Sequence, residues 1–169
     1  MNNNGIEIER KFLIRHPGEQ WLSSQPGSRR VNIVQTYLLS EDGASRRVRS
    51  WEEGGHVCYI KTVKRMLSAL SREEAEEEIN REEYDALLRE MDPERKPVVK
   101  TRWCIPYSGH TLEIDHYESW WEDLSILEIE LSSEGEAYSI PPDLEVIREV
   151  TGDRRYLNSS MAREMPPRG

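Results

Sequence analysis

The sequence is short of cysteine and of long apolar runs, and these shortages exclude several classes of protein. Its two cysteines, Cys58 and Cys104, lie 46 positions apart and lack the spacing of metal ligands, so we expect two reduced thiols. No apolar run reaches the roughly 20 residues that a membrane-spanning helix needs. The first ten residues, MNNNGIEIER, contain no apolar segment typical of a signal peptide. A cytoplasmic protein without a membrane partner is therefore expected.

Positive charge is also in short supply. Lys and Arg together number 23 against 32 Asp and Glu, which gives a net charge of −9. General nucleic-acid binders are usually basic, so this balance argues against such a partner, although it leaves room for a local basic cluster that binds a small anion. The 169 residues are 36% apolar and 33% charged, and they contain no internal repeat and no linker. We therefore expect a single domain over residues 1–169 with a core of its own.

Strand patterns dominate the chain. Two short turn signals, Gly54-Gly55 and Ser108-Gly109, separate neighbouring segments and favour antiparallel hairpins. The segments predicted to be strands are Ile6–Ile14, Val31–Leu39, Ser45–Trp51, His56–Val63, Pro97–Ile105, His110–Glu118 and Leu124–Ser132.

Helical patterns are fewer, and one of them is ambiguous. Residues Asn80–Met91 begin with a predicted N-cap, Asn80, and repeat apolar residues at helical spacing. Two more helices are predicted from Pro141 and from Asp153, with Gly152 as the stop between them. The segment LSREEAEEEI, residues 70–79, has the composition of a helix, yet its charged residues also alternate as they would in a strand.

Charged side chains share one face of nearly every predicted strand. In GIEIERKFLI, Glu7, Glu9 and Lys11 alternate with mostly apolar residues, and alternate side chains of a strand point to opposite faces. An ordinary antiparallel sheet with one solvated face explains any single strand of this kind. The signs, however, sort along the chain, which favours a closed or nearly closed barrel with its charges facing the lumen. The basic set is Arg47, Arg49, Lys61, Lys100 and Arg102, and the acidic set is Glu113, Asp115, Glu128 and Glu130.

A lumen of this kind favours a ligand that carries both signs of charge. Confined carboxylates repel one another, and desolvated charges without partners cost several kcal/mol each. A polyphosphate with divalent cations satisfies both sets, because Lys and Arg donate to phosphate oxygens and carboxylates supply hard oxygens for Mg²⁺ or Mn²⁺. On this interpretation Glu7 and Glu9 face metal and Lys11 faces phosphate.

The same residues resemble a known family. The segment EIERKFL carries an E-x-E-x-K motif, and the blocks QTYL, RVR, IKT, KTRW, EID and EIE follow it in order. The segment EVTGDRRYLNSSMA, residues 149–162, is similar to the C-terminal helical segment of short bacterial members. Together these blocks resemble the CYTH superfamily, the triphosphate tunnel metalloenzymes, over nearly the whole chain, and specifically its short bacterial inorganic triphosphatases.

The resemblance implies a fold and a reaction. The fold is α+β and mainly β: an eight-stranded antiparallel closed β-barrel tunnel with a charged interior and helices packed on the outside. The ambiguous segment SREEAEEEI then becomes a strand, against its helical propensity. The reaction is hydrolysis of inorganic triphosphate at its terminal phosphoanhydride, assisted by Mg²⁺ or Mn²⁺ and a water molecule. Long-chain polyphosphate and nucleoside triphosphates are further candidate substrates.

The resemblance also implies roles for single residues. Lys11 and Glu9 are the candidate catalytic residues. The predicted phosphate clamp is Lys11, Arg47, Arg49, Lys61, Lys100 and Arg102, and the predicted metal ligands are Glu7, Glu9, Asp115, Glu128 and Glu130. Further residues are expected in the lumen, where each either meets the ligand or neutralises the wall: Arg72, Glu74, Glu76, Glu78 and Glu113. Tyr156 is expected to close one end of the tunnel or simply to pack there.

Three alternatives stay open at this stage. The family includes a class of adenylyl cyclases, but the sequence offers no obvious cluster of residues to read adenine. A thiamine triphosphatase requires aromatic side chains that sandwich the thiamine. From another class, a polyphosphate-binding module without turnover would use the same tunnel, although anion binding alone does not need so many carboxylates of metal-binding type. A homodimer is an expectation based on the family only.

Overall fold

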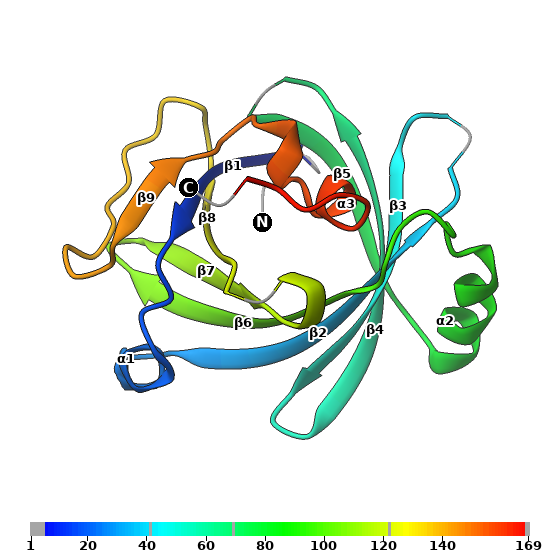
Figure 1. Cartoon of the computed structure of the whole chain (residues 1–169), viewed down its shortest axis with the longest axis horizontal. Helices are drawn as coiled ribbons and strands as arrows, with labels where there is room; N and C mark the ends of the chain where they lie inside the picture. The colour runs from blue at the N-terminus through cyan, green and yellow to red at the C-terminus, as the bar shows by residue number, and fades with distance from the viewer. Residues whose placement is uncertain (1–5, 41, 69, 122, 168–169) are drawn as a thin grey trace.

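The computed structural model describes residues 6–40, 42–68, 70–121 and 123–167, and its main feature is a closed antiparallel barrel. The strand order is β5-β4-β3-β2-β6-β7-β8-β1, and a further pairing of β5 with β1 closes the ring, as seen in Figure 1. The predicted eight-stranded barrel is therefore confirmed. Its strands are β1 (Ile6–Ile14), β2 (Arg29–Leu38), β3 (Ser45–Glu53), β4 (His56–Met66), β5 (Ser71–Ile79), β6 (Val98–Tyr107), β7 (His110–Tyr117) and β8 (Ser125–Leu131).

Strand β1 closes the barrel and accepts two different partners along one of its edges. One edge pairs with β8 from Ile8 to Leu13. The other edge pairs first with β5, through only three residue pairs beginning at Ile6, and then with a short ninth strand, β9 (Val146–Glu149), from Phe12 onward. Between these two partners, none of the described strands pairs with the middle of this edge of β1.

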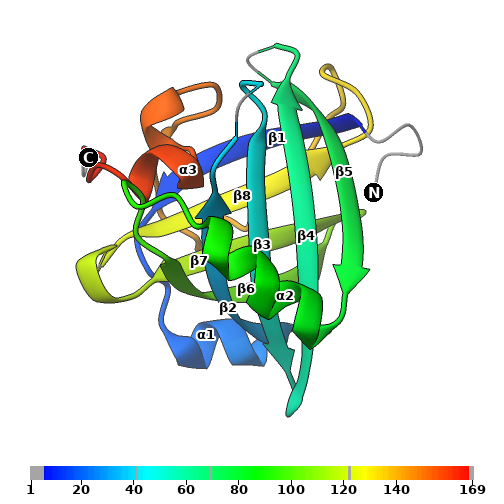
Figure 2. The ribbon, with the colours of Figure 1, turned by 90° about the vertical axis from the view of Figure 1, so that its right-hand side faces the viewer.

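The apolar faces of the strands point outward, opposite to the usual arrangement of a barrel. Outward residues of β1, β6, β7 and β8 form one cluster with Leu22 of α1 (Glu19–Ser24) and with Leu144 from the segment before β9. Val48 of β3 and Ile79 of β5 form a second cluster. This second cluster is covered by α2 (Arg81–Leu87) and the 3₁₀ turn η1 (Leu88–Glu90), which lie across β3 and β4 in Figure 2. The charged faces are left to point inward.

One end of the barrel is filled by apolar side chains. Inward residues at this end, among them Leu13, Tyr37 and Tyr117, pack with Trp121 of the 3₁₀ turn η2 (Ser119–Trp121) and with the C-terminal segment. That segment comprises the 3₁₀ turn η3 (Arg154–Tyr156) and α3 (Asn158–Met161), and it lies within the outline of the ring in Figure 1. Hydrogen bonds hold it in place, including the Trp121 Nε1–H donating to the Met161 carbonyl at 2.8 Å. The C-terminal segment is thus a plug, residues 150–163.

The helical predictions meet mixed outcomes. The helix after Asn80 is confirmed as α2 and η1, and the Asn80 side chain accepts a hydrogen bond from the Glu83 backbone at 2.8 Å. The ambiguous segment is a strand, β5, as the resemblance implied. The helix predicted from Pro141 is wrong, because residues Val146–Glu149 form β9 and supply backbone partners to β1. The helix predicted from Asp153 is reduced to η3 and α3, and α1 was not predicted.

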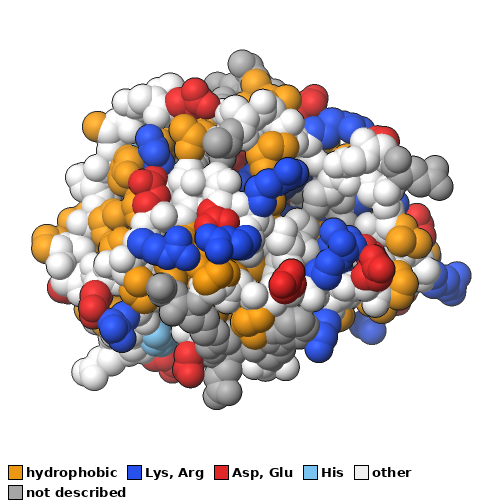
Figure 3. All heavy atoms as spheres, turned by 45° about the horizontal axis from the view of Figure 1, so that its top comes forward, with side chains coloured by type: hydrophobic (Ala, Val, Ile, Leu, Met, Phe, Trp, Pro, Cys, Tyr) orange, Lys and Arg blue, Asp and Glu red, His pale blue; other side chains and the backbone are white. Residues whose placement is uncertain are grey.

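The surface is mixed in character. Figure 3 shows Lys, Arg, Asp and Glu side chains interspersed with small apolar patches on the face it displays. Within the described part of the chain, no helix has the length and apolarity required to span a membrane.

Candidate functional site

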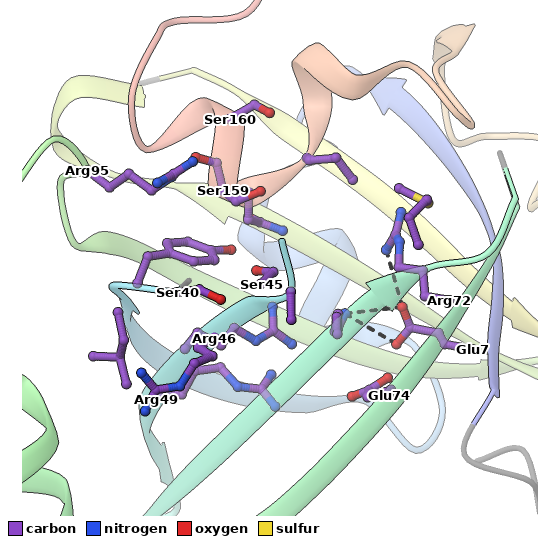
Figure 4. Close-up of a pocket in the computed structure, with 18 of the residues that line it drawn as sticks. Glu7, Ser40, Ser45, Arg46, Arg49, Arg72, Glu74, Arg95, Ser159 and Ser160 are labelled. Carbon is purple, nitrogen blue, oxygen red and sulfur yellow. Dashed lines mark hydrogen bonds and ion pairs between the residues drawn. The ribbon is translucent and has the colours of Figure 1, made fainter. Parts of the chain in front are cut away.

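The barrel encloses a cavity of about 760 Å³ that is lined mainly by charged side chains. Residues of all eight barrel strands contribute to its walls, while the loop between β2 and β3 and residues of the plug surround its mouth. Figure 4 shows Arg46, Ser40 and Ser45 on one side of this mouth and Arg95, Ser159 and Ser160 on the other. The interior predicted from strand alternation is therefore a real cavity with a polar entrance.

Two arginines on the inward face of β3 form a basic part of the wall. Arg47 and Arg49 are 8% and 3% exposed, and both line the cavity. The Nε atom of Arg47 is buried without a hydrogen-bond partner, and no ion pair to Arg47 occurs within the described residues. Burial and the charge of Arg47 lower the pKa of Arg49 to about 10, even though Glu76 lies 3.1 Å from its Nη2 atom. Two like charges confined in this way favour a bound anion.

The carboxylates gather on the neighbouring strands β1 and β8. Glu9 lies directly opposite Glu130 in the strand register, and Lys11 lies opposite Glu128. Burial, followed by the charges of Glu128 and Glu7, raises the pKa of Glu9 to about 7. Burial likewise raises the pKa of Glu130, with help from nearby carboxylates. In contrast, Lys11 and other cations hold the pKa of Glu128 well below its usual range, against the effect of burial.

Cations of β1 itself, of the neighbouring β5 and of β4 partly compensate this negative charge. Arg72 Nη1 donates to Glu9 at 2.6 Å and to Glu7 at 3.2 Å, and Lys64 Nζ donates to Glu7 at 3.1 Å, as the dashed lines to Glu7 in Figure 4 show. Lys11 Nζ lies 3.4 Å from Glu128 Oε1 and donates to the Tyr156 carbonyl at 3.2 Å. Each candidate metal ligand of β1 is therefore held by a basic side chain in this arrangement.

The donor set fits a divalent cation by its chemistry. In the described part of the chain, no three Asp, Glu, His or Cys side chains converge on a point that would hold a metal ion. Nevertheless, Glu7, Glu9, Glu128 and Glu130 place carboxylate oxygens on two adjacent strands, and the charges of Glu128 and Glu7 add to burial in raising the pKa of Glu9. Oxygen-rich, crowded carboxylates are the ligands that Mg²⁺ and Mn²⁺ prefer.

Lys100 and Asp115 do not belong to the cavity wall, contrary to the prediction that they bind phosphate and metal. Both side chains are fully buried, and their ion pair measures 2.8 Å. Asp115 also accepts two hydrogen bonds from Arg102, at 2.7 and 2.9 Å, and neither Lys100 nor Asp115 lines the cavity. Burial lowers the pKa of Lys100 to about 8 despite Asp115. This pair supports Arg102, which does line the cavity, and Arg102 in turn lies 2.5 Å from Glu113.

The prediction that Lys61 faces the lumen is wrong. The β3–β4 register places Lys61 opposite Val48, and Val48 belongs to the outer cluster under α2. Tyr59, on the same face as Lys61, stacks with Tyr84 of α2 at a centroid distance of 4.5 Å. The basic residue that reaches the cavity from β4 is Lys64, which is opposite Ser45 and Glu74.

The remaining predicted residues divide into two groups. Arg72, Glu74, Glu76 and Glu113 line the cavity, whereas Glu78 does not. Tyr156 is buried in the plug, where its hydroxyl accepts a hydrogen bond from Arg148 at 2.6 Å and donates to the Pro167 carbonyl. The Tyr156 backbone carbonyl accepts a hydrogen bond from a site residue, Lys11.

The sequence analysis missed the basic residues at the mouth of the cavity. They lie in loops and at strand ends, where the alternation of side chains gives no signal: Arg46, Arg95 and Arg163.

Comparison with known proteins agrees with this geometry. The chain matches the model of the CYTH domain over residues 5–163. It is 36% identical over 160 residues to an inorganic triphosphatase of Acetivibrio thermocellus, covering 94% of each chain. It is 31% identical over 163 residues to an inorganic triphosphatase of Nitrosomonas europaea, covering 95% of this chain and 99% of the relative. A crystal structure of an inorganic triphosphatase superposes with a TM-score of 0.60 at 28% identity, covering 95% of this chain and 97% of that one.

Proposed function

Because the chain belongs to the CYTH domain family, we propose that it is an inorganic triphosphatase that hydrolyses a terminal phosphoanhydride bond with the help of a divalent cation. The observation that carries the proposal is Arg47, a buried guanidinium without an ion-pair partner in the described residues, beside a second buried guanidinium and across from a cluster of carboxylates. A small, highly charged anion that also binds cations is the ligand that satisfies all three features. Inorganic triphosphate is such an anion.

The basic residues bind and orient the substrate. Arg47, Arg49 and Arg102 present guanidinium groups from two strands, and each offers charge-assisted hydrogen bonds to phosphate oxygens. Lys11 and Lys64 approach from β1 and β4. Their present partners are carboxylates, so an arriving phosphate competes for them with Glu128 and Glu7. Phosphoryl transfer depends mostly on positioning and on charge neutralisation, which is what such a clamp provides.

The acidic residues would hold the cation. Glu7, Glu9, Glu128 and Glu130 would bind Mg²⁺ or Mn²⁺, which when bound neutralises phosphate charge and lowers the pKa of a coordinated water. Glu9 and Lys11 are the proposed catalytic residues. Glu9 is a buried carboxylate that lines the cavity on the same face of β1 as Lys11, where it would bind the cation and help to orient its water toward the substrate. Lys11 Nζ lies within 3.4 Å of Glu128 and points into the same part of the cavity.

A phosphate-release assay with a panel of substrates tests the proposal. The panel contains inorganic triphosphate, pyrophosphate, ATP, thiamine triphosphate and long-chain polyphosphate, each with Mg²⁺ and with Mn²⁺, and triphosphate is expected to be hydrolysed fastest. The variants Arg47→Ala and Glu9→Ala are expected to lose activity, while Lys61→Ala, which removes one positive charge from the outer face, retains it.

Three results would overturn the proposal. Phosphate release from triphosphate no faster than that of the Arg47→Ala variant would exclude hydrolysis at this site. Tight triphosphate binding by calorimetry, without hydrolysis under either cation, would assign the cavity to a binding module instead. Formation of cyclic AMP from ATP would move the assignment to a cyclase.

A further inference from the structure

The middle of β1 is held by a side chain where a strand is missing. The edge of β1 that pairs with β5 loses this partner after Ile8, and β9 begins only opposite Phe12. Lys11 lies in this gap, and it is 4% exposed, so its backbone N–H needs a protein acceptor. The acceptor is the Thr151 hydroxyl, whose Oγ1 atom lies 2.9 Å from the Lys11 nitrogen.

The Thr151 hydroxyl is itself held in place. A hydroxyl has one hydrogen to donate and accepts with its lone pairs. The Thr151 Oγ1 lies 2.9 Å from the Glu149 carboxylate and 3.3 Å from the Lys11 carbonyl, so Glu149 is the closer acceptor. The Glu149 carboxylate also forms an ion pair of 3.1 Å with Arg10. The hydroxyl is therefore fixed in the orientation that accepts from Lys11.

The plug contacts Lys11 at three separate points. The Val150 N–H donates to the Lys11 carbonyl at 2.8 Å, Thr151 accepts from the Lys11 N–H, and the Tyr156 carbonyl accepts from Lys11 Nζ at 3.2 Å. Gly152, between these contacts, has a φ of +76°, which allows the chain to leave the sheet directly after Thr151. Backbone and side chain of Lys11 are thus fixed by one short segment, residues 150–156.

We propose that Thr151 is a positioning residue for Lys11. Between β5 and β9 no strand carbonyl accepts the Lys11 N–H in the described residues, and the Thr151 hydroxyl accepts it instead. This hydrogen bond fixes the direction in which the Lys11 amine enters the cavity. The kinetic part of this inference rests on the proposed triphosphatase function. Small misplacements of a catalytic group lower rates strongly, about 100-fold for a displacement of 1 Å.

A matched pair of substitutions tests the proposal. Thr151→Val keeps the shape and removes the hydroxyl, whereas Thr151→Ser keeps the hydroxyl. We expect Thr151→Val to lower kcat for triphosphate by about 10- to 100-fold and Thr151→Ser to stay within a few-fold of wild type. In a Lys11→Ala background, Thr151→Val should cause no further loss, because the hydroxyl acts through Lys11. Equal losses in both backgrounds would indicate a general structural role and overturn the proposal.

Amide hydrogen exchange provides a readout that does not depend on activity. The Lys11 amide is expected to exchange at least about tenfold faster in Thr151→Val than in wild type or Thr151→Ser, while the Phe12 amide, one residue along β1, keeps its protection. Unchanged protection of Lys11 in Thr151→Val would refute the positioning role. If the wild type fails to hydrolyse triphosphate but the exchange result holds, the proposed function fails and the structural part of this inference stands.

Discussion

The variant Glu9→Gln is expected to stabilise the metal-free protein while it abolishes hydrolysis. Glu9 is 7% exposed, and burial together with Glu128 and Glu7 raises its pKa to about 7. An acid whose pKa is raised by folding destabilises the native state whenever it is ionised. Glutamine has nearly the same shape, keeps an oxygen that accepts from Arg72, and carries no charge at any pH.

The magnitude follows from the two pKa values. A glutamate in an unfolded chain titrates near pH 4.3, and one pKa unit corresponds to 1.36 kcal/mol. The destabilisation by ionised Glu9 is therefore absent well below pH 4.3, grows between about pH 4.3 and 7, and reaches about 4 kcal/mol at pH 8. The attraction of Lys11 and Arg72 is already contained in the pKa of about 7. The free energy of unfolding of Glu9→Gln should exceed that of wild type by about 4 kcal/mol at pH 8 and by about 1 kcal/mol at pH 5.

Urea denaturation with EDTA present, followed by fluorescence of the five tryptophans, measures this difference. Glu73→Gln, which neutralises an exposed glutamate of β5, is the matched control and should change stability little at either pH. Added Mg²⁺ should stabilise the wild type more than Glu9→Gln, because the cation loses a ligand in the variant. A variant that is less stable than wild type at pH 8, or a difference that does not depend on pH, would refute the reasoning.

Three further outcomes are expected. Arg47→Ala should lower kcat/KM for triphosphate by about 10- to 100-fold, whereas Lys61→Ala, with the same change of charge, should stay within about twofold; equal effects in steady-state phosphate release would contradict the assignment of the two faces. Lys100→Met leaves Asp115 buried with one cation fewer, so the free energy of unfolding in urea should fall by about 2–4 kcal/mol, and an unchanged midpoint would argue against the pair's structural role. Met161→Ala truncates a fully buried side chain of the plug and should cost about 2–5 kcal/mol by thermal or urea denaturation, so a loss below about 1 kcal/mol would mean that the plug packs loosely.

Most of the barrel was predictable because its strands are long and strictly alternating. In β1, β6 and β8 the charged residues occupy alternate positions and the residues between them are mostly apolar. This alternation identified the inward face of these strands correctly. Strand β5 was predictable only from the family resemblance, because its glutamates and arginine favour a helix in isolation. Pairing with β4 and β1 in the closed barrel overrides that preference.

The errors have identifiable causes. In β4, Lys61 and Lys64 stand in opposite phases, so alternation alone cannot decide which one faces inward. The turn decides it: Gly54 and Gly55 form a two-residue hairpin with Glu53 opposite His56, and this register carries Lys61 to Val48. Lys100 and Asp115 are in the inward phase, but their side chains are fully buried and do not line the cavity. Alternation gives the face of a strand on which a residue lies, not whether it reaches the cavity.

The segment before the plug was misjudged for a different reason. Residues Val146–Glu149 have enough helix formers for a helix to be predicted, but the unpaired edge of β1 offers them backbone hydrogen bonds. Its β-branched residues, Val146 and Ile147, were a signal for a strand that the prediction did not use. Whether an edge is free can be known only once the whole barrel is assembled.

Apolar packing lies on the outside of the barrel, and the charges that would contact a ligand lie inside it. Packing of the barrel wall and preference for a ligand therefore depend on different side chains. Replacing an interior charge alters the electrostatic balance of the cavity but removes no apolar contact from the outer clusters around Phe12 and Val48. Selection in the laboratory for a longer or differently shaped anion should therefore accumulate changes at inward positions, whereas changes at outward positions would be rejected for loss of folding. In this architecture the charges that select a ligand and the apolar contacts that hold the barrel wall together lie on opposite faces of the same strands.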